Sequence, residues 1–217
     1  MKNIILILFT LLAFNAFAQK VINAKSVNKK SAKTNTYKFE NGDIYKGQFK
    51  KEKMHGQGTY QYLAGKIYVG SFENGEVSGY GECRYPNGDF YKGEWSEGKK
   101  HGEGVYEYAN GAVYKGKFEN NYKNGKATYE LPSGDTYIGD YKHNHRTGSG
   151  VFKFANGERY EGQFLNGDMH GKGVYYFKDG AILQCNWISN RRNGNCIKIA
   201  SNKVKTELNY FNDKRQN

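Results

Sequence analysis

The sequence has little that would build an enzyme or a membrane-spanning helix. It lacks the Gly-x-Ser-x-Gly, His-Glu-x-x-His and protein-kinase signatures, so the catalytic classes defined by those motifs are not indicated. Its Gly-x-Gly segments lack the following helix and Lys-Ser/Thr of phosphate-binding loops. The apolar run at residues 4–17 is too short to cross a bilayer comfortably, and no other run approaches it. We therefore expect no catalytic residues, no metal site and no cofactor.

The first eighteen residues have the features of a secretory signal peptide. Lys2 precedes the apolar run, and Ala16-Phe17-Ala18 forms a small-x-small cleavage site near Ala18-Gln19. This pattern predicts a cleaved signal over residues 1–18 and a bacterial protein of the periplasm or the outside of the cell. An uncleaved anchor is the alternative. Residues 19–36 are rich in Lys, Asn and Ser without any acid, which is typical of a flexible basic leader.

The remainder of the chain is dominated by a repeat of 23 residues. Each unit opens on Tyr-x-Gly-x-aromatic, continues with Gly-x-Gly and ends on a turn glycine. The opening tyrosines are Tyr45, Tyr68, Tyr91, Tyr114, Tyr137 and Tyr160, and Leu183 occupies the seventh slot. The turn glycines are Gly42, Gly65, Gly88, Gly111, Gly134, Gly157 and Gly180. Copied units of this size stack so that each buries its apolar side against its neighbours.

Apolar residues and glycines alternate with a period of two, which is the spacing of β-strands. Asn-Gly pairs such as Asn87-Gly88 mark turns that require a positive φ. We predict an all-β fold, an elongated single-layer antiparallel β-meander of about six and a half hairpin repeats. Because side chains alternate between the two faces of a sheet, an odd repeat of 23 residues would move the aromatic residues to the other face in each successive unit. One loop per repeat must therefore take up an extra residue, and a three-residue hairpin loop with a glycine bulge would do so.

This register leads to specific predictions of facing residues. Within the third hairpin we expect Tyr91 to face Tyr106, Gly93 to face Gly104, and Trp95 to face Gly102. We expect the glycines to leave room for the large rings to lie over the sheet. Between hairpins we expect Tyr68 opposite Tyr62.

The repeat closely resembles the MORN repeat (membrane occupation and recognition nexus), which combines Tyr-x-Gly-x-Trp/Phe, His-Gly-x-Gly and Tyr-x-x-Asn-Gly. The resemblance covers residues 37–197, with residues 198–217 as a tail that covers the open edge of the sheet. The fourth unit departs from the pattern at Asn124, Ala127 and Leu131. The resemblance implies a non-enzymatic scaffold that binds protein partners, dimerises or contacts acidic phospholipids.

Three cysteines require separate interpretation. Cys185 and Cys196 occupy slots that hold facing glycines in other repeats. Their joint replacement predicts a cross-strand disulfide, the alternative being two unpaired thiols. Cys83 stands in an aromatic slot, where we expect a buried thiol that packs as a small apolar residue.

The net charge of +12 is concentrated at the two ends. Residues 1–36 carry six lysines and no acid, residues 37–190 are nearly neutral, and residues 191–217 carry seven basic and two acidic groups. Lys46, Lys92 and Lys115 share one slot of the repeat, but Val69 and Ile138 interrupt this row. We therefore expect no nucleic-acid partner.

The sequence leaves three functional hypotheses. The first is binding of a protein partner, or of a second copy, through an aromatic face, and the second is contact of the basic ends with anionic phospholipid or envelope polymer. The third, a glycan-processing enzyme, requires convergent carboxylates that a flat meander does not readily supply. Stacking of the repeats explains the aromatic row better than a sugar platform does.

His55, His101 and His170 lie in separate repeats and are better explained as turn-end residues than as metal ligands. The candidate partner-binding residues are Tyr68, Tyr91, Trp95, Tyr106, Tyr108, Tyr114, Tyr137 and Tyr160.

Overall fold

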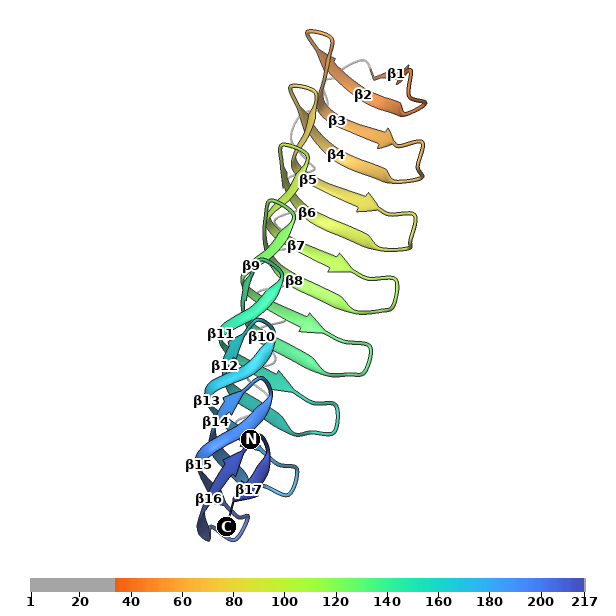
Figure 1. Cartoon of the computed structure of the whole chain (residues 1–217). Helices are drawn as coiled ribbons and strands as arrows, with labels where there is room; N and C mark the ends of the chain where they lie inside the picture. The colour runs from red at the N-terminus through yellow and green to blue at the C-terminus, as the bar shows by residue number, and fades with distance from the viewer. Residues whose placement is uncertain (1–33, 217) are drawn as a thin grey trace, which may run out of the picture. The chain divides into compact units, whose positions relative to one another are not determined.

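The computed structural model describes residues 34–216, and the predicted signal peptide and nearly all of the leader lie outside the described residues. Residues 34–216 form one open antiparallel sheet of 17 strands, in which every strand pairs with the next one along the chain (Figure 1). No helix long and apolar enough to cross a membrane occurs among these residues. The predicted all-β meander is confirmed.

The strands alternate between seven and nine residues through the repeats. The first eight are β1 (Asn35–Lys38), β2 (Ile44–Lys50), β3 (Lys53–Gln61), β4 (Ile67–Glu73), β5 (Glu76–Arg84), β6 (Phe90–Ser96), β7 (Lys99–Glu107) and β8 (Val113–Glu119). The others are β9 (Tyr122–Glu130), β10 (Thr136–Lys142), β11 (His145–Lys153), β12 (Arg159–Leu165), β13 (Asp168–Tyr176), β14 (Ile182–Ile188), β15 (Arg191–Ile199), β16 (Lys205–Phe211) and β17 (Lys214–Gln216).

Two kinds of turn connect the strands. A two-residue turn closes each hairpin, and both of its residues have positive φ, as at Glu97 (50°) and Gly98 (72°). This conformation matches the twist of the flanking strands. The turn glycines occupy the second kind, in which Tyr108 and Ala112 enclose a three-residue loop and Gly111 has a φ of 89°. The predicted glycine-bulge loop is therefore confirmed.

The register agrees with prediction at the centre of each hairpin and differs toward the turn. Tyr91 pairs with Tyr106 and Gly93 with Gly104, as expected. Beyond Gly93 the pairing shifts, and Trp95 lies opposite Lys100 instead of Gly102. Gly102 has a φ of 59° and forms part of the irregular segment that causes the shift.

Two other sequence expectations require correction. Tyr68 pairs with Tyr60, not Tyr62, because the loop between β3 and β4 closes around Leu63, Ala64 and Gly65. The C-terminal segment covers the edge of the last hairpin, as expected, but it does so by extending the sheet. Strand β16 pairs with β15, and β17 with β16, so the sheet continues past residue 197. Strand β1 likewise begins at Asn35, inside the expected leader.

The core lies on one face of the sheet, which we call the tyrosine face. The ring of Tyr91 lies across the facing glycines of its hairpin, and its hydroxyl donates a hydrogen bond to the carbonyl of Glu94 at 2.9 Å. A Cβ atom built on Gly93 would lie 2.6 Å from the Tyr91 hydroxyl oxygen and 2.6 Å from the Cα of Gly104. Facing glycines therefore leave the room that lets a tyrosine ring lie on its own sheet.

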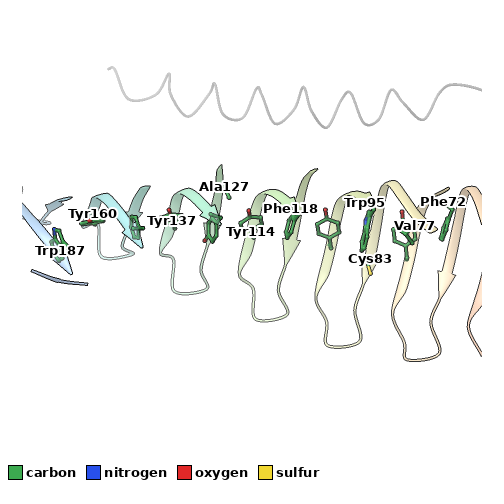
Figure 2. Close-up of a cluster of buried hydrophobic side chains, with 14 of the residues drawn as sticks. Phe72, Val77, Cys83, Trp95, Tyr114, Phe118, Ala127, Tyr137, Tyr160 and Trp187 are labelled. Atoms are coloured by element: carbon green, nitrogen blue, oxygen red, sulfur yellow. The ribbon is translucent and has the colours of Figure 1, made fainter. Parts of the chain in front are cut away.

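Each buried tyrosine also contacts two aromatic rings edge-on. Tyr91 contacts Trp95 of its own strand at 5.1 Å between ring centroids and Phe118 of the next repeat at 5.2 Å. The same pair of contacts recurs through the stack at 4.9–5.4 Å with interplanar angles of 71–89° (Figure 2). These edge-to-face contacts are the geometry that aromatic quadrupoles favour. The continuous row of rings serves as the core of a sheet that has one layer.

The seventh repeat replaces the ring with a covalent bond. Leu183 stands in the tyrosine slot, and a disulfide joins Cys185 of β14 to Cys196 of β15, with their Cα atoms 4.4 Å apart. The two cysteines fill the space that facing glycines leave to a ring in other repeats. The predicted disulfide is present, and Cys83 is a buried unpaired thiol.

Replacing Gly93 by alanine should destabilise the sheet by roughly 2 kcal/mol, because the added methyl group would force Tyr91 or the facing strand to move. Urea unfolding followed by circular dichroism would measure the change in the free energy of unfolding. Gly98→Asn is a matched control, because Asn121 and Asn144 occupy its slot with positive φ in other repeats. Equal losses for the two variants would show that the close fit of the ring does not matter.

Candidate interaction surface

Six of the eight residues predicted to bind a partner are buried inside the chain. Tyr68, Tyr91, Tyr114, Tyr137 and Tyr160 have at most 1% of their surface exposed, and Trp95 has 6%. Aromatic residues of the adjoining repeats cover their rings. Stacking of the repeats therefore explains this row of rings. These six therefore cannot form an exposed face. Tyr106 and Tyr108 are half-buried and retain accessible surface, so their role in binding stays a prediction.

Tyr106 and Tyr108 belong to a second row of rings, which we call the aromatic strip. All its members are half-buried and pack against the buried row. They are Phe39, Tyr60, Tyr62, Tyr85, Tyr106, Tyr108, Tyr129, Phe152, Phe154, Tyr175 and Phe177. Neighbouring rings lie 4.5–6.0 Å apart. Cys83 and Leu131 occupy strip slots without a ring.

Carboxylates in the loops hold some of the strip tyrosines in place. The Tyr106 hydroxyl donates to Asp89 Oδ2 at 2.7 Å, and Asp89 Oδ1 accepts from the Ala109 amide at 2.8 Å. Tyr60 and Asp43 make the equivalent hydrogen bond at 2.8 Å. The Leu63 amide and the Tyr60 hydroxyl lower the pKa of Asp43. These tyrosines of the strip are therefore oriented before any partner arrives.

A row of cations lies beside the strip, in the slot that faces the second aromatic of each hairpin. Lys100 lies opposite Trp95, and its Nζ is 4.4 Å from the ring centroid of Tyr106. Lys123 Nζ is 4.6 Å from the ring centroid of Tyr129. Arg146 Cζ is 5.2 Å from the ring centroid of Phe152. We call these three residues the cationic segment.

The cationic segment lies against aromatic rings, and Asp89 is an acidic group whose charge acts on Lys100. Five ion pairs occur in residues 34–216, and none involves Lys100, Lys123 or Arg146. Burial lowers the pKa of Lys100. Burial, with the charge of Lys100 as the second cause, lowers the pKa of Lys123 to about 8. A cation–π contact offsets part of the cost of removing a cation from water.

The histidines and the turn glycines of the described residues stand at positions set by the repeat. No group of three His, Cys, Asp or Glu residues in the described part of the chain could hold a metal ion. His55, His101 and His170 stand at equivalent positions of β3, β7 and β13, in separate hairpins. The turn glycines all have φ between 84° and 92°, which is a conformational role. The arrangement is suited to binding an extended ligand.

Sequence reasoning missed the cationic segment for an identifiable reason. It placed Gly102 opposite Trp95, whereas the shifted register brings Lys100 there. The available signal was a slot 23 residues apart that holds Lys100, Lys123 and Arg146 in consecutive units. This slot belongs to the tyrosine face. The lysines that the sequence analysis considered, Lys46, Lys92 and Lys115, follow the opening tyrosines directly and therefore lie on the opposite face.

An open sheet of stacked hairpins, with its core in one row of rings, defines a β-hairpin repeat protein. A sequence profile of the MORN repeat matches residues 45–65, 68–90, 91–113, 114–136, 137–159 and 160–182. The chain belongs to the MORN repeat family. No curated protein sequence matches it significantly.

Two solved structures show a partial likeness to this chain at low sequence identity. The SAS-4 (dCPAP) TCP domain of Drosophila melanogaster, solved with a proline-rich motif of Ana2 (dSTIL), is 16% identical, with a TM-score of 0.46 over 83% of this chain and 94% of that one. The TCP10 domain of Danio rerio CPAP is 14% identical, with a TM-score of 0.48 over 81% and 83%. With both TM-scores below 0.5, these likenesses carry no information about the partner of this chain.

Replacing Lys123 by methionine should stabilise the protein at pH 7 by roughly 1 kcal/mol, since the residue keeps some contact with solvent. Below pH 8 the Lys123 ammonium is charged in both the folded and the unfolded protein, so the full cost of burying this charge lowers the stability of the wild type. Between pH 8 and 10.5 the folded state loses this proton first, and the wild type gains stability relative to the variant. The difference should therefore shrink at pH 9.5.

Thermal unfolding of both proteins at pH 7 and 9.5 would measure this difference. Lys117→Met is the control, because Lys117 is exposed on the opposite face of the same hairpin. A Lys123→Met variant less stable than the wild type at pH 7 would contradict the burial cost.

Proposed function

We propose that this protein is a non-enzymatic scaffold that binds a protein partner along the aromatic strip, in the periplasm or outside the cell. The observation that carries the proposal is the row of half-buried rings, interrupted only at Cys83 and Leu131, on a sheet that residues 34–216 cover with no second layer. Exposed apolar surface of this kind typically marks an interface. Aromatic side chains are enriched in protein interfaces because they bury much surface with few rotatable bonds.

Location outside the cytoplasm is supported by two features. The sequence of residues 1–18 has the pattern of a signal peptide. The Cys185–Cys196 disulfide is of a kind that persists in oxidising compartments.

The partner could also be a second copy of the chain. Both ends of the described sheet, β1 and β17, are strands with one paired neighbour. Such edges present unpaired backbone groups that favour association. Self-association is therefore a specific form of the same scaffold function.

Association with anionic lipid or envelope polymer is the second candidate. The observation that favours it is the concentration of positive charge in residues 1–36 and 191–217. Contact of this type weakens steeply with added salt. Binding through the aromatic strip should weaken less with salt than lipid contact does, because apolar burial supplies much of its free energy.

Site-specific photo-crosslinking would test the proposal. A photoreactive phenylalanine analogue placed at Tyr108, on the strip, should give a light-dependent adduct with another protein in the cells that make this chain. The same analogue at Lys117, on the opposite face, should give little adduct. An adduct of twice the chain mass would identify self-association.

Equal adducts at positions 108 and 117, or none at 108, would overturn the proposed role of the strip. Sedimentation with phosphatidylglycerol vesicles at low and high salt would test the second candidate. Binding that high salt abolishes would support it, and no binding at low salt would reject it.

A further inference from the structure

The cationic segment is not required by the fold. The slot of Lys100, Lys123 and Arg146 is occupied in the first, second and sixth repeats by Met54, Val77 and Met169. In the seventh repeat it holds Arg192, which forms an ion pair with Asp213 of the same chain. Met54, Val77 and Met169 make the same cross-strand pairing with the second aromatic of their hairpin, and Val77 is buried. An apolar side chain therefore satisfies the slot, and the three consecutive cations at the centre of the stack need another explanation.

These cations also have unused hydrogen-bonding capacity. Their charged groups lie against rings, which accept no strong hydrogen bond, and they form no ion pair with any acidic group in residues 34–216. A lysine ammonium carries three donors and an arginine guanidinium five. A half-buried cation beside an apolar surface binds an anion more strongly than a fully solvated one does.

The spacing of the segment limits the form of its ligand. Equivalent residues of consecutive repeats are separated by two strand spacings, about 9.6 Å. A polyproline II helix has three residues per turn and a rise of about 3.1 Å, so every third side chain recurs on one side at about 9.3 Å. A β-strand puts every third residue on alternate sides. Acids at every third position of a polyproline II segment would therefore match three consecutive repeats.

The neighbouring strip suits the same conformation. Polyproline II segments dock on rows of aromatic rings because their conformation is formed before binding. Tyr85 and Tyr106 flank Lys100, with ring centroids 5.8 and 4.4 Å from its Nζ. The Lys100 ammonium group thus lies near strip rings of two adjacent repeats.

We infer that Lys100, Lys123 and Arg146 bind acidic side chains at every third residue of a partner segment that lies along the aromatic strip in polyproline II conformation. This inference rests on the proposed function, since it specifies what the strip binds. The basic ends of this chain do not fit, because residues 1–36 carry no acid and residues 191–217 carry two acids against seven basic groups. Charge complementarity therefore favours an acidic segment of another protein.

Fluorescence anisotropy with synthetic peptides would test the inference on the full chain. The probe is a labelled peptide of four Glu-Pro-Pro units. A peptide of four Gln-Pro-Pro units removes the charge, and a peptide with all four glutamates before the prolines keeps the charge but loses the spacing. The first peptide should bind about 100-fold more tightly than the glutamine peptide and about tenfold more tightly than the blocked one.

A matched pair of variants separates site binding from net charge. Lys100→Met/Lys123→Met/Arg146→Met should weaken binding of the Glu-Pro-Pro peptide about 100-fold. It should remain folded, because Met54 and Met169 occupy the same slot, and circular dichroism would verify this. Lys117→Met/Lys142→Met/Lys153→Met removes the same number of charges from exposed positions. Its affinity should stay within about threefold of wild type.

Each unfavourable outcome has a distinct meaning. No binding of the Glu-Pro-Pro peptide, equal binding of the blocked peptide, or equal losses in both triple variants would overturn the inference. An adduct at position 108 that persists unchanged in the Lys100/Lys123/Arg146 variant would overturn it while leaving the proposed function intact. Absence of both the adduct and peptide binding would overturn both. A third outcome is that the wild type binds phosphatidylglycerol vesicles but not the Glu-Pro-Pro peptide, and that only the Lys100/Lys123/Arg146 variant loses vesicle binding. This outcome would assign the cationic segment to lipid and overturn the peptide inference.

Discussion

The structure depends on one steric constraint, namely that a tyrosine ring lies flat on the strands that carry it. This is possible where two glycines face each other, as Gly93 faces Gly104 beneath Tyr91. The ring then reaches the carbonyl three residues ahead, and the second aromatic of the next repeat covers its free edge. A sheet normally buries a face against a second layer. Here each repeat supplies the cover for the previous one, so the core grows with the number of repeats.

Departures from the repeat follow from the same constraint. In the seventh unit the loss of the ring at Leu183 coincides with side chains at both glycine slots, and those side chains are joined as Cys185–Cys196. In the fourth unit Ala127 stands opposite Gly116, and Tyr114 keeps its hydrogen bond to the Lys117 carbonyl at 2.9 Å. One methyl group is accommodated on one side of the pair. Larger groups occur where the ring is absent.

The surface next to the core has the character of a binding site more than of a packing layer. Lys123 has a lowered pKa because it is partly removed from water near Lys100, whereas Met169 fills the equivalent slot without this cost. A residue that costs stability where an apolar one would fit is a candidate for function. The aromatic strip and the cationic segment together form a linear surface whose period is that of the repeat, which suits an extended ligand.

Periodicity alone was sufficient to predict the all-β meander, the positive φ of the turn glycines, the Tyr91–Tyr106 and Gly93–Gly104 pairs, and the cysteine pair of the seventh repeat. These follow because alternation defines the face of each residue and equal spacing defines equivalent positions. Tertiary structure decided which residues of that face are neighbours beyond Gly93, that the opening tyrosines are buried, and that the sheet continues through β16 and β17. The physical reason is parity: a register shift of two residues keeps every side chain on its face. No pattern of alternation can distinguish Gly102 from Lys100 as the partner of Trp95, and the cationic segment depends on that difference.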